Sequence, residues 1–382
     1  MNLLLLVKNI DGGTGKFIID LYSILNRYWA KKNGNTLHII CLEKPHFRKL
    51  RLFKTIKYIH PKKYYESYYK LNGRILSLFL SEVTTLNNLL KLYNSDIAIG
   101  IDIHSNFLLI INKLLNNNKL RVICTTHIDL LQTIKSKASY PLMMVLKSAV
   151  KMLYAQADYL IGCSNGVSKQ LERDFKLKRN SVHTIYLGVK KPTKNILRNR
   201  NRKTFTFATV GRLEEQKSID TIISALNLLN GMVDSPVLLR IIGDGTQRSE
   251  LIKQVSSLRL SEQVIFRGWR QNIERELINT DAFILSSKRE GFPYVLLEAL
   301  SVGLPIISSN VPYGPSEILK GGKYGVLVPM QNAEALAEKM YELVTSKRKY
   351  SYYANKSIER SNFFTLDKMA DSYMKVLRNF EN

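Results

Sequence analysis

Short apolar runs, most of them followed by a helical pattern, recur along the whole chain. NLLLLV at 2–7 is a continuous apolar run, which is typical of a strand buried on both faces of a parallel sheet. The residues after it, as far as Gly34, carry the spacing of an amphipathic helix. Further strands are predicted within 36–42, 95–102, 121–129, 157–171, 181–189, 204–226, 237–252, 263–277, 283–287 and 305–309. This alternation predicts an α/β protein built on parallel sheets.

The length of 382 residues is sufficient for two domains of ordinary size. Residues 191–203 are polar, basic and contain a proline, so we expect a linker there between domains at 1–190 and 204–364. The sequence has no apolar run long enough to span a bilayer, and NLLLLV is too short for a signal peptide. The three cysteines lie in apolar strand patterns without ligand-like spacing, which predicts reduced thiols in a core: Cys41, Cys124 and Cys163.

Residues 286–310, SSKREGFPYVLLEALSVGLPIISSN, carry the main candidate chemistry. They are expected to form a loop and a helix between two strands, with Glu290 in the loop and Glu298 on the second helical turn. Gly291 tolerates unusual backbone angles, and Pro293 is favoured in a first helical turn. A helix N-terminus is a ready anion site, and two carboxylates can bind hydroxyls, so the stretch suggests a sugar nucleotide. The alternative is an ordinary buried crossover with solvated glutamates.

Two other strand ends carry candidate ligands. Arg212 and Lys217 follow the strand at 204–210, and two cations at a strand-to-helix loop suit a diphosphate. His127 lies just past the strand that begins at 121, at the edge where open α/β sheets bind ligands, with Asp129 close by. A lone histidine is more often structural.

A glycine-rich loop, NIDGGTGKF, is expected between the first strand and the first helix. Gly12 and Gly13 would allow a phosphate to approach the backbone there, or they form a plain tight turn. The loop is not a Walker A motif, because Phe17 follows Lys16 where Ser or Thr belongs, and it is not GxGxxG.

The string EGFPYVLLEALSVGLPIISSNVPYGPSEIL resembles the donor-site signature of the retaining glycosyltransferases of family 4, the group 1 enzymes typical of bacterial surface polysaccharides. The resemblance implies the GT-B architecture, two Rossmann-like domains facing across a cleft, and a last segment, 365–382, that packs back on the first domain. The sequence departs from the family pattern at Tyr186 and Leu187, where a family turn is expected. The resemblance does not extend over residues 44–118.

The resemblance also implies roles for particular residues. The catalytic set would be Glu290, His127, Arg212 and Lys217. In that scheme the two cations neutralise the leaving diphosphate, and His127 reaches the sugar hydroxyls. Glu290 would bind the sugar and Glu298 the ribose. The remaining donor-binding residues would be Gly12, Gly13, Arg267, Gly268, Gly291, Phe292 and Pro293.

We therefore expect transfer of a sugar from a nucleotide donor, UDP-linked, to a glycan acceptor carried on polyprenyl diphosphate, with retention of configuration. No cofactor is expected, and no metal, because no DxD-like pair stands near the predicted pocket. Capsule, O-antigen or another surface polysaccharide would be the product. A non-catalytic binding protein on the same scaffold is the main alternative. A dinucleotide oxidoreductase is a further class, but the GxGxxG fingerprint typical of such enzymes is absent from this sequence.

The net charge of +26 is concentrated in the first half: residues 1–195 carry +20 and residues 196–382 carry +6. Residues 44–74 hold ten Lys/Arg, one acid and seven Phe/Tyr. Such a segment suits an anionic membrane surface. A solvated face is the alternative, and nucleic acid is not expected, because no nucleic-acid-binding motif accompanies the charge. The sequence thus predicts a cytoplasmic enzyme, peripheral at the inner face of the cytoplasmic membrane.

Overall fold

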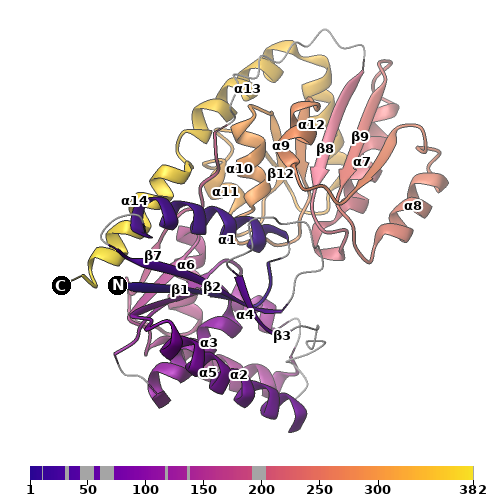
Figure 1. Ribbon diagram of the computed structural model, residues 1–382. Coiled ribbons are helices and arrows are strands. Elements are labelled where there is room, and N and C mark those ends of the chain that lie inside the picture. Colours follow the sequence, from indigo (N-terminus) through magenta and orange to yellow (C-terminus); the bar gives the residue numbers. More distant parts are fainter. Residues whose placement is uncertain are drawn as a thin grey trace. The chain divides into compact units, whose positions relative to one another are not determined.

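The computed structural model (Figure 1) describes residues 1–10, 12–30, 34–43, 56–60, 73–116, 119–135, 138–191 and 204–381. The chain divides into two compact units. Unit 1 comprises Met1–Tyr186 together with Met369–Asn382, and unit 2 comprises Leu187–Lys368. Each unit contains a parallel sheet with helices packed against it, as the alternation of strands and helices predicted.

Unit 1 is built on a seven-stranded sheet with the order β3-β2-β1-β4-β5-β6-β7. The strands are β1 (Asn2–Val7), β2 (Thr36–Glu43), β3 (Ile56–His60), β4 (Ile97–Gly100), β5 (Arg121–Thr126), β6 (Tyr159–Gly162) and β7 (Val182–Thr184). The central strand β1 pairs in parallel with β2 on one side and with β4 on the other. Its Leu3–Leu6 are fully buried, which explains why the sequence of this strand is apolar without alternation.

Helices cover both faces of this sheet. Figure 1 shows α2, α3 and α5 on one side and α1 and α14 on the other. The helical segments of this unit are α1 (Gly12–Leu25), the π-helical turn η1 (Asn26–Ala30), α2 (Gly73–Leu92), α3 (Ile103–Asn116), α4 (Leu130–Lys135), α5 (Tyr140–Tyr154), α6 (Asn165–Asp174) and most of α14 (Leu366–Arg378). The predicted core thiols Cys41, Cys124 and Cys163 are buried and free, so that prediction is confirmed.

Unit 2 is built on a six-stranded sheet with the order β10-β9-β8-β11-β12-β13. The strands are β8 (Phe205–Val210), β9 (Val237–Ile242), β10 (Val264–Gly268), β11 (Ala282–Leu285), β12 (Ile306–Ser309) and β13 (Val326–Val328). The helices are η3 (Glu215–Lys217), α7 (Ile219–Asn230), α8 (Arg248–Ser257), α9 (Ile273–Ile278), α10 (Tyr294–Ser301), α11 (Pro315–Ile318), α12 (Ala333–Thr345) and α13 (Lys347–Ser361). The apolar faces of α7, α8, α12 and α13 meet those of the strands in one continuous core.

The division between the units differs from the expected boundaries by a few residues. Unit 2 begins at Leu187, before the expected linker, because Gly188 packs on Thr365 so closely that an added Cβ would lie 2.3 Å from its carbonyl oxygen. Val189 also pairs with Thr365 in an isolated parallel bridge, and the Tyr294 hydroxyl donates to the Gly188 carbonyl at 2.6 Å. The chain returns to unit 1 within α14, at Met369.

Two other predictions of local structure need correction, one strand was not predicted, and two predicted segments lie mostly outside the described residues. The prediction of a glycine-rich loop between the first strand and the first helix is wrong, because α1 already begins at Gly12. The strand expected over 181–189 is limited to Val182–Thr184. A strand that we did not predict, Ile56–His60, lies within the basic and aromatic stretch 44–74. Most of that stretch and of the expected linker 191–203 lies outside the described residues.

None of the helices in the described ranges is both long and apolar enough to cross a bilayer.

Candidate active site

In unit 2, the turn that joins β8 to α7 carries both predicted diphosphate cations. Arg212 follows the strand after one glycine, and its exposed guanidinium pairs with Glu214, with 2.7 Å between Nη1 and Oε1. Lys217 ends the short helix η3, and Ser218 then takes a left-handed conformation with φ 48° before α7 begins. The aliphatic part of Lys217 lies over Gly211, where an added Cβ would be 3.4 Å from Lys217 Cε.

Lys217 and Glu290 form a close ion pair, with 2.6 Å between Nζ and Oε1. Their side chains keep only 19% and 9% of their exposure, so the pair is largely shielded from water. The Ser287 hydroxyl donates to the same carboxylate oxygen at 2.6 Å. β8 and β11 are neighbours in the sheet and run parallel, so the loops after them meet at one edge and bring these side chains together.

Four further contacts lock the loop after β11 to its neighbours. The Ser286 hydroxyl donates to the Lys217 carbonyl at 2.7 Å, and the backbone N–H of Lys288 donates to the Gln216 carbonyl at 2.8 Å. Gln216 Nε2 in turn donates to the Arg289 carbonyl at 2.8 Å. From the next strand, the Ser309 hydroxyl donates to the Ser287 carbonyl at 2.6 Å.

We had not singled out any of these serines or Gln216 from the sequence. The available signal was the Ser-Ser pair at each of the two strand ends, 286–287 and 308–309.

The start of α10 is fixed by packing around Gly291, Phe292 and Pro293. All three are buried, and Pro293 stands at the N-cap with φ −66°. Gly314 lies against them at φ +82°, where an added Cβ would be only 2.6 Å from the Gly291 carbonyl oxygen. The Phe292 ring packs against the Phe364 ring, with 5.5 Å between their centroids, so the Phe292 side chain is part of the packed interior. Only the backbone of this segment is left for a ligand.

The other predicted donor residues of unit 2 stand in different settings. Glu298 lies on the second turn of α10 and is half-buried. Arg267, at the end of β10, is paired with Glu276 of α9, with 3.2 Å between Nε and Oε2. Arg270 shares the same carboxylate at 3.4 Å. Gly268 takes φ +66° and has no atom within 4 Å of the place of a Cβ, so its backbone is approachable.

In unit 1, the predicted glycine pair occupies the first turn of α1. No atom lies within 4 Å of a Cβ added at Gly12 or Gly13, so a substrate could approach their backbone. Gly15, which we had not singled out, is the tightly packed glycine. An added Cβ there would lie 1.8 Å from the Ile10 carbonyl oxygen. The third glycine of DGGTG was the signal available in the sequence.

His127 follows the end of β5 and is half-buried. Its ring lies 4.4 Å from the Phe17 ring, centroid to centroid, and its Nε2 lies 3.0 Å from Thr125 Oγ1. The Thr125 hydroxyl donates its only proton to the Gly100 carbonyl at 2.9 Å. It must therefore accept from the histidine, which places the imidazole proton on Nε2 and leaves Nδ1 as an acceptor.

Burial lowers the pKa of His127 from 6.5 to about 4, and the negative charge of Asp102 opposes that shift only in part. The ring is therefore neutral at pH 7. The neighbouring Asp129 has a structural role, because its Oδ1 accepts from the backbone of Gln132 at 2.9 Å and from Gln170 Nε2 at 2.8 Å.

Models of known families match almost the whole chain. The model for glycosyltransferase family 4 matches residues 12–191, and the model for glycosyl transferases group 1 matches residues 191–360. Each covers most of one unit, and together they leave only the two ends of the chain unmatched.

The chain belongs to the group 1 glycosyltransferases.

Among curated proteins, this group 1 glycosyltransferase chain is similar to an uncharacterized glycosyltransferase of Methanocaldococcus jannaschii, at 27% identity over 60% of this chain and 65% of that protein. It is similar to the N-acetylgalactosamine-N,N'-diacetylbacillosaminyl-diphospho-undecaprenol 4-alpha-N-acetylgalactosaminyltransferase of Campylobacter jejuni, at 24% identity over 61% of this chain and 64% of that one. The lipopolysaccharide 1,6-galactosyltransferase of Salmonella typhimurium shares 29% identity over 51% and 55%. The matched regions thus span less than two thirds of these relatives.

Solved structures resemble the chain over nearly all its length. Anabaena HepE, in complex with UDP-glucose, has a TM-score of 0.79 at 18% identity, covering 99% of this chain and 100% of that one. The apo form of WaaB, a lipopolysaccharide outer core galactosyltransferase, has a TM-score of 0.71 at 20% identity, covering 99% of each chain. At these identities the likeness establishes the fold, which is GT-B with two Rossmann-like units.

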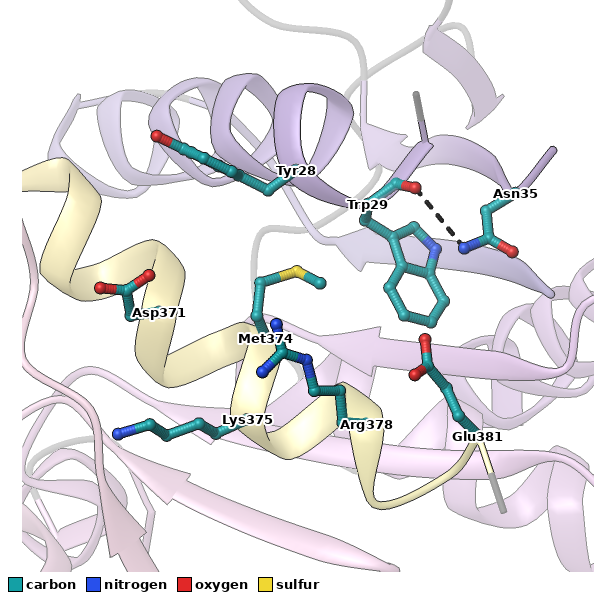
Figure 2. Close-up of a pocket in the computed structure, with 8 residues that line it drawn as sticks. All are labelled: Tyr28, Trp29, Asn35, Asp371, Met374, Lys375, Arg378 and Glu381. Carbon is teal, nitrogen blue, oxygen red and sulfur yellow. Dashed lines mark hydrogen bonds between the residues drawn. The ribbon is translucent and has the colours of Figure 1, made fainter. Parts of the chain in front are cut away.

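A separate hollow of about 460 Å³ lies within unit 1, and none of the predicted site residues lines it (Figure 2). It lies between the turn after α1 and the last turns of α14, and its lining carries two basic and two acidic side chains. The residues that line it are Tyr28, Trp29, Asn35, Asp371, Met374, Lys375, Arg378 and Glu381. Its balanced charge distinguishes it from the cation-bearing turn after β8.

In the described part of the chain, no group of three or more His, Cys, Asp or Glu side chains is arranged to hold a metal ion.

Proposed function

We propose that this protein transfers a sugar from a UDP-linked donor to a glycan acceptor carried on polyprenyl diphosphate, with retention of the anomeric configuration. The observation that supports this most directly is the shielded Lys217–Glu290 pair beside the exposed Arg212, on a GT-B scaffold. This arrangement offers positive charge for a diphosphate and a carboxylate for sugar hydroxyls at one sheet edge. We assign the product to capsule, O-antigen or other surface polysaccharide synthesis.

In this proposal Arg212 and Lys217 stabilise the charge that grows on the diphosphate as the bond to the sugar breaks. Fixed cations in a partly dehydrated site can stabilise a transition state without moving, which is an effective use of electrostatics. Glu290 holds Lys217 in position and accepts from a sugar hydroxyl, while Glu298 accepts from the ribose. The backbone N–H groups at the start of α10 supply further donors. No cofactor or divalent metal takes part in the proposed reaction.

His127 acts as a neutral hydrogen-bond acceptor in this scheme. Its Nε2 proton is directed to Thr125, so Nδ1 can accept from a hydroxyl of the donor sugar. A neutral ring suits a reaction in which positive charge develops on the sugar, because an imidazolium would oppose that charge. The low pKa of His127 keeps this form dominant at physiological pH.

The choice of donor and acceptor rests on relatives. HepE is seen in complex with UDP-glucose, and the Campylobacter jejuni relative is named for an undecaprenol diphosphate acceptor. A lipid-linked acceptor places the reaction at a membrane surface. We propose the inner face of the cytoplasmic membrane, with residues 44–74 contributing basic and aromatic contacts; those residues lie largely outside the described ranges.

The test is release of UDP from a panel of UDP- and GDP-sugars, with and without polyprenyl-diphosphate-linked glycans. We expect one UDP-sugar to be consumed much faster when a lipid-linked acceptor is present, and proton NMR of the product to show the donor's anomeric configuration. Glu290→Gln should lower turnover with little loss of fold. Consumption of GDP-sugars alone, an inverted product, or equal rates for Glu290→Gln and wild type would each contradict a part of the assignment.

A further inference from the structure

Helix α5 in unit 1 exposes an unusually apolar surface. Its sequence, YPLMMVLKSAVKMLY, contains only three strongly polar side chains, yet only Val150 and Tyr154 are buried. Figure 1 shows α5 beside α3, on the same side of the sheet as α2. The large apolar side chains left exposed on α5 are Tyr140 (73%), Met144 (46%), Val145 (62%) and Met152 (70%). An exposed apolar patch of this kind marks an interaction site more often than a solvated surface.

The exposed positions of α5 form one continuous stripe. Successive residues of an α-helix are turned by about 100°, so all seven exposed positions fall within roughly 140° of the helix circumference. They are Tyr140, Pro141, Met144, Val145, Ser148, Lys151 and Met152. Only two of the seven are polar. The buried residues Val150 and Tyr154 lie on the opposite side, so the stripe faces away from the sheet.

The charges on α5 and on the residues next to it in the sequence are all positive. From residue 130 to residue 156 the sequence contains four lysines and no acid. Lys147 and Lys151 lie along one edge of the apolar stripe, and Lys135 ends the preceding helix. Lysines beside an apolar stripe can bury their stems and place their ammonium groups among lipid phosphates. In a symmetric contact between two copies, the same lysines would instead be brought near one another.

We propose that α5 docks unit 1 on an anionic lipid bilayer. In this arrangement Met144, Val145 and Met152 enter the boundary between headgroups and acyl chains, and Lys147 and Lys151 pair with phosphates. This surface is distinct from residues 44–74. It would bring the enzyme to the lipid-linked acceptor of the proposed function, but the docking itself needs no sugar substrate and is measured without one.

An environment-sensitive probe on α5 tests insertion directly. The three native cysteines are buried, so a new cysteine from Met152→Cys can be labelled selectively with a nitrobenzoxadiazole dye. Met232→Cys, at an exposed position in unit 2, is the matched control. With vesicles containing phosphatidylglycerol, the dye at 152 should shift to the blue and be quenched by nitroxide-labelled lipids, while the dye at 232 should not respond. If the protein binds the vesicles but the fluorescence of the dye at position 152 does not change, the proposal is wrong.

Substitution of the stripe gives a second measurement. Val145→Ser with Met152→Ser removes apolar surface without adding charge and should lower the vesicle partition coefficient about tenfold or more. Leu228→Ser with Met232→Ser, also exposed but in unit 2, should leave it unchanged. Lys147→Gln with Lys151→Gln should reduce the preference for anionic over neutral vesicles, and an unchanged preference would contradict the pairing of these lysines with lipid phosphates.

A protein partner is the competing occupant of this surface. If the wild type dimerises in sedimentation equilibrium and the serine pair on α5 makes it monomeric, the stripe is a protein interface and the proposal is wrong. Failure of every nucleotide sugar to react would refute the proposed function but leave vesicle binding as a separate result.

Discussion

Acidification should destabilise unit 1 through His127. In the folded protein burial holds the pKa of this histidine at about 4, compared with 6.5 for an unperturbed histidine. The unfolded chain therefore takes up a proton below pH 6.5 that the folded chain refuses until about pH 4. Stability from this group is complete above pH 6.5 and is lost as the pH falls toward 4, because in that window the unfolded state binds more protons.

The size of the effect follows from the two pKa values. Each tenfold change in a protonation equilibrium corresponds to about 1.4 kcal/mol, so the full difference between the two pKa values corresponds to about 3 to 4 kcal/mol, of which about 2 kcal/mol falls between pH 7 and pH 5. His127 is half-buried, so some hydration of the charged form reduces these figures. The variant His127→Gln removes the titrating group and keeps a polar side chain beside Thr125.

The two tryptophans allow unit 1 to be observed alone. Trp29 is buried in unit 1, and Trp269 belongs to unit 2. In a Trp269→Phe background, fluorescence during urea unfolding reports on unit 1. Between pH 7 and pH 5 the chain with His127 should lose about 1–2 kcal/mol more unfolding free energy than the chain with His127→Gln, and the other histidines cancel in this comparison. Parallel pH profiles, or a pKa near 6.5 for His127 by NMR titration, would refute the reasoning.

Three further predictions concern other contacts. Lys217→Met and Glu290→Gln should show a coupling of about 1–3 kcal/mol in the unfolding free energy of unit 2 by a double-mutant cycle, because each leaves the other without its shielded partner; additive effects would exclude the pair. Gly15→Ala should destabilise unit 1 by about 2–4 kcal/mol in urea unfolding, because its Cβ meets a backbone carbonyl, while Gly13→Ala serves as a control with open space around it and should change little. Arg212→Ala should reduce the turnover of the donor by at least about tenfold in UDP-release assays, whereas EDTA should not; activity that needs Mg²⁺ would contradict the metal-independent proposal.

The strands were predictable because each satisfies a local requirement. A strand of a parallel sheet that is covered by helices on both faces is apolar along its whole length, and β1 begins and ends where its apolar run does. The start of α10 was predictable for the same kind of reason, since Pro293 fits the edge of a helix and not its middle. Such features depend only on near neighbours in the sequence.

The edge of the first sheet was not predictable in this way. Among the strands that the structure describes, β3 has one neighbour, β2, and its sequence IKYIH mixes charged and apolar residues. An edge strand needs less apolar surface than a central one, so the stretch reads as a basic surface segment. The first turn of α1 was not predicted for a different reason. Glycine is a poor helix former, so Gly12 and Gly13 indicated a loop, although the helix begins at Gly12 and packs closely on Ile10 at Gly15.

The partners of the site residues depend on sheet order, which local patterns do not contain. Lys217 and Glu290 are 73 positions apart, and they meet because β11 returns beside β8 while β9 and β10 extend the sheet on its other side. From the sequence we could place a cation and a carboxylate each at a strand end, but not on adjacent strands. The contacts of Ser287 and Ser309 in the site could not be predicted either, because they also depend on the order of the strands in the sheet.

This pairing changes how the site would receive a diphosphate. Each cation at the β8 turn already has an acidic partner: Arg212 with Glu214, and Lys217 with Glu290. The exposed pair is screened by water and weak, so Arg212 can exchange its partner at little cost. The shielded pair is harder to separate, so Lys217 would keep Glu290 and share its remaining N–H donors with the phosphate. A carboxylate that stays beside the lysine then lies next to the sugar end of the diphosphate, which is where the proposed mechanism requires Glu290.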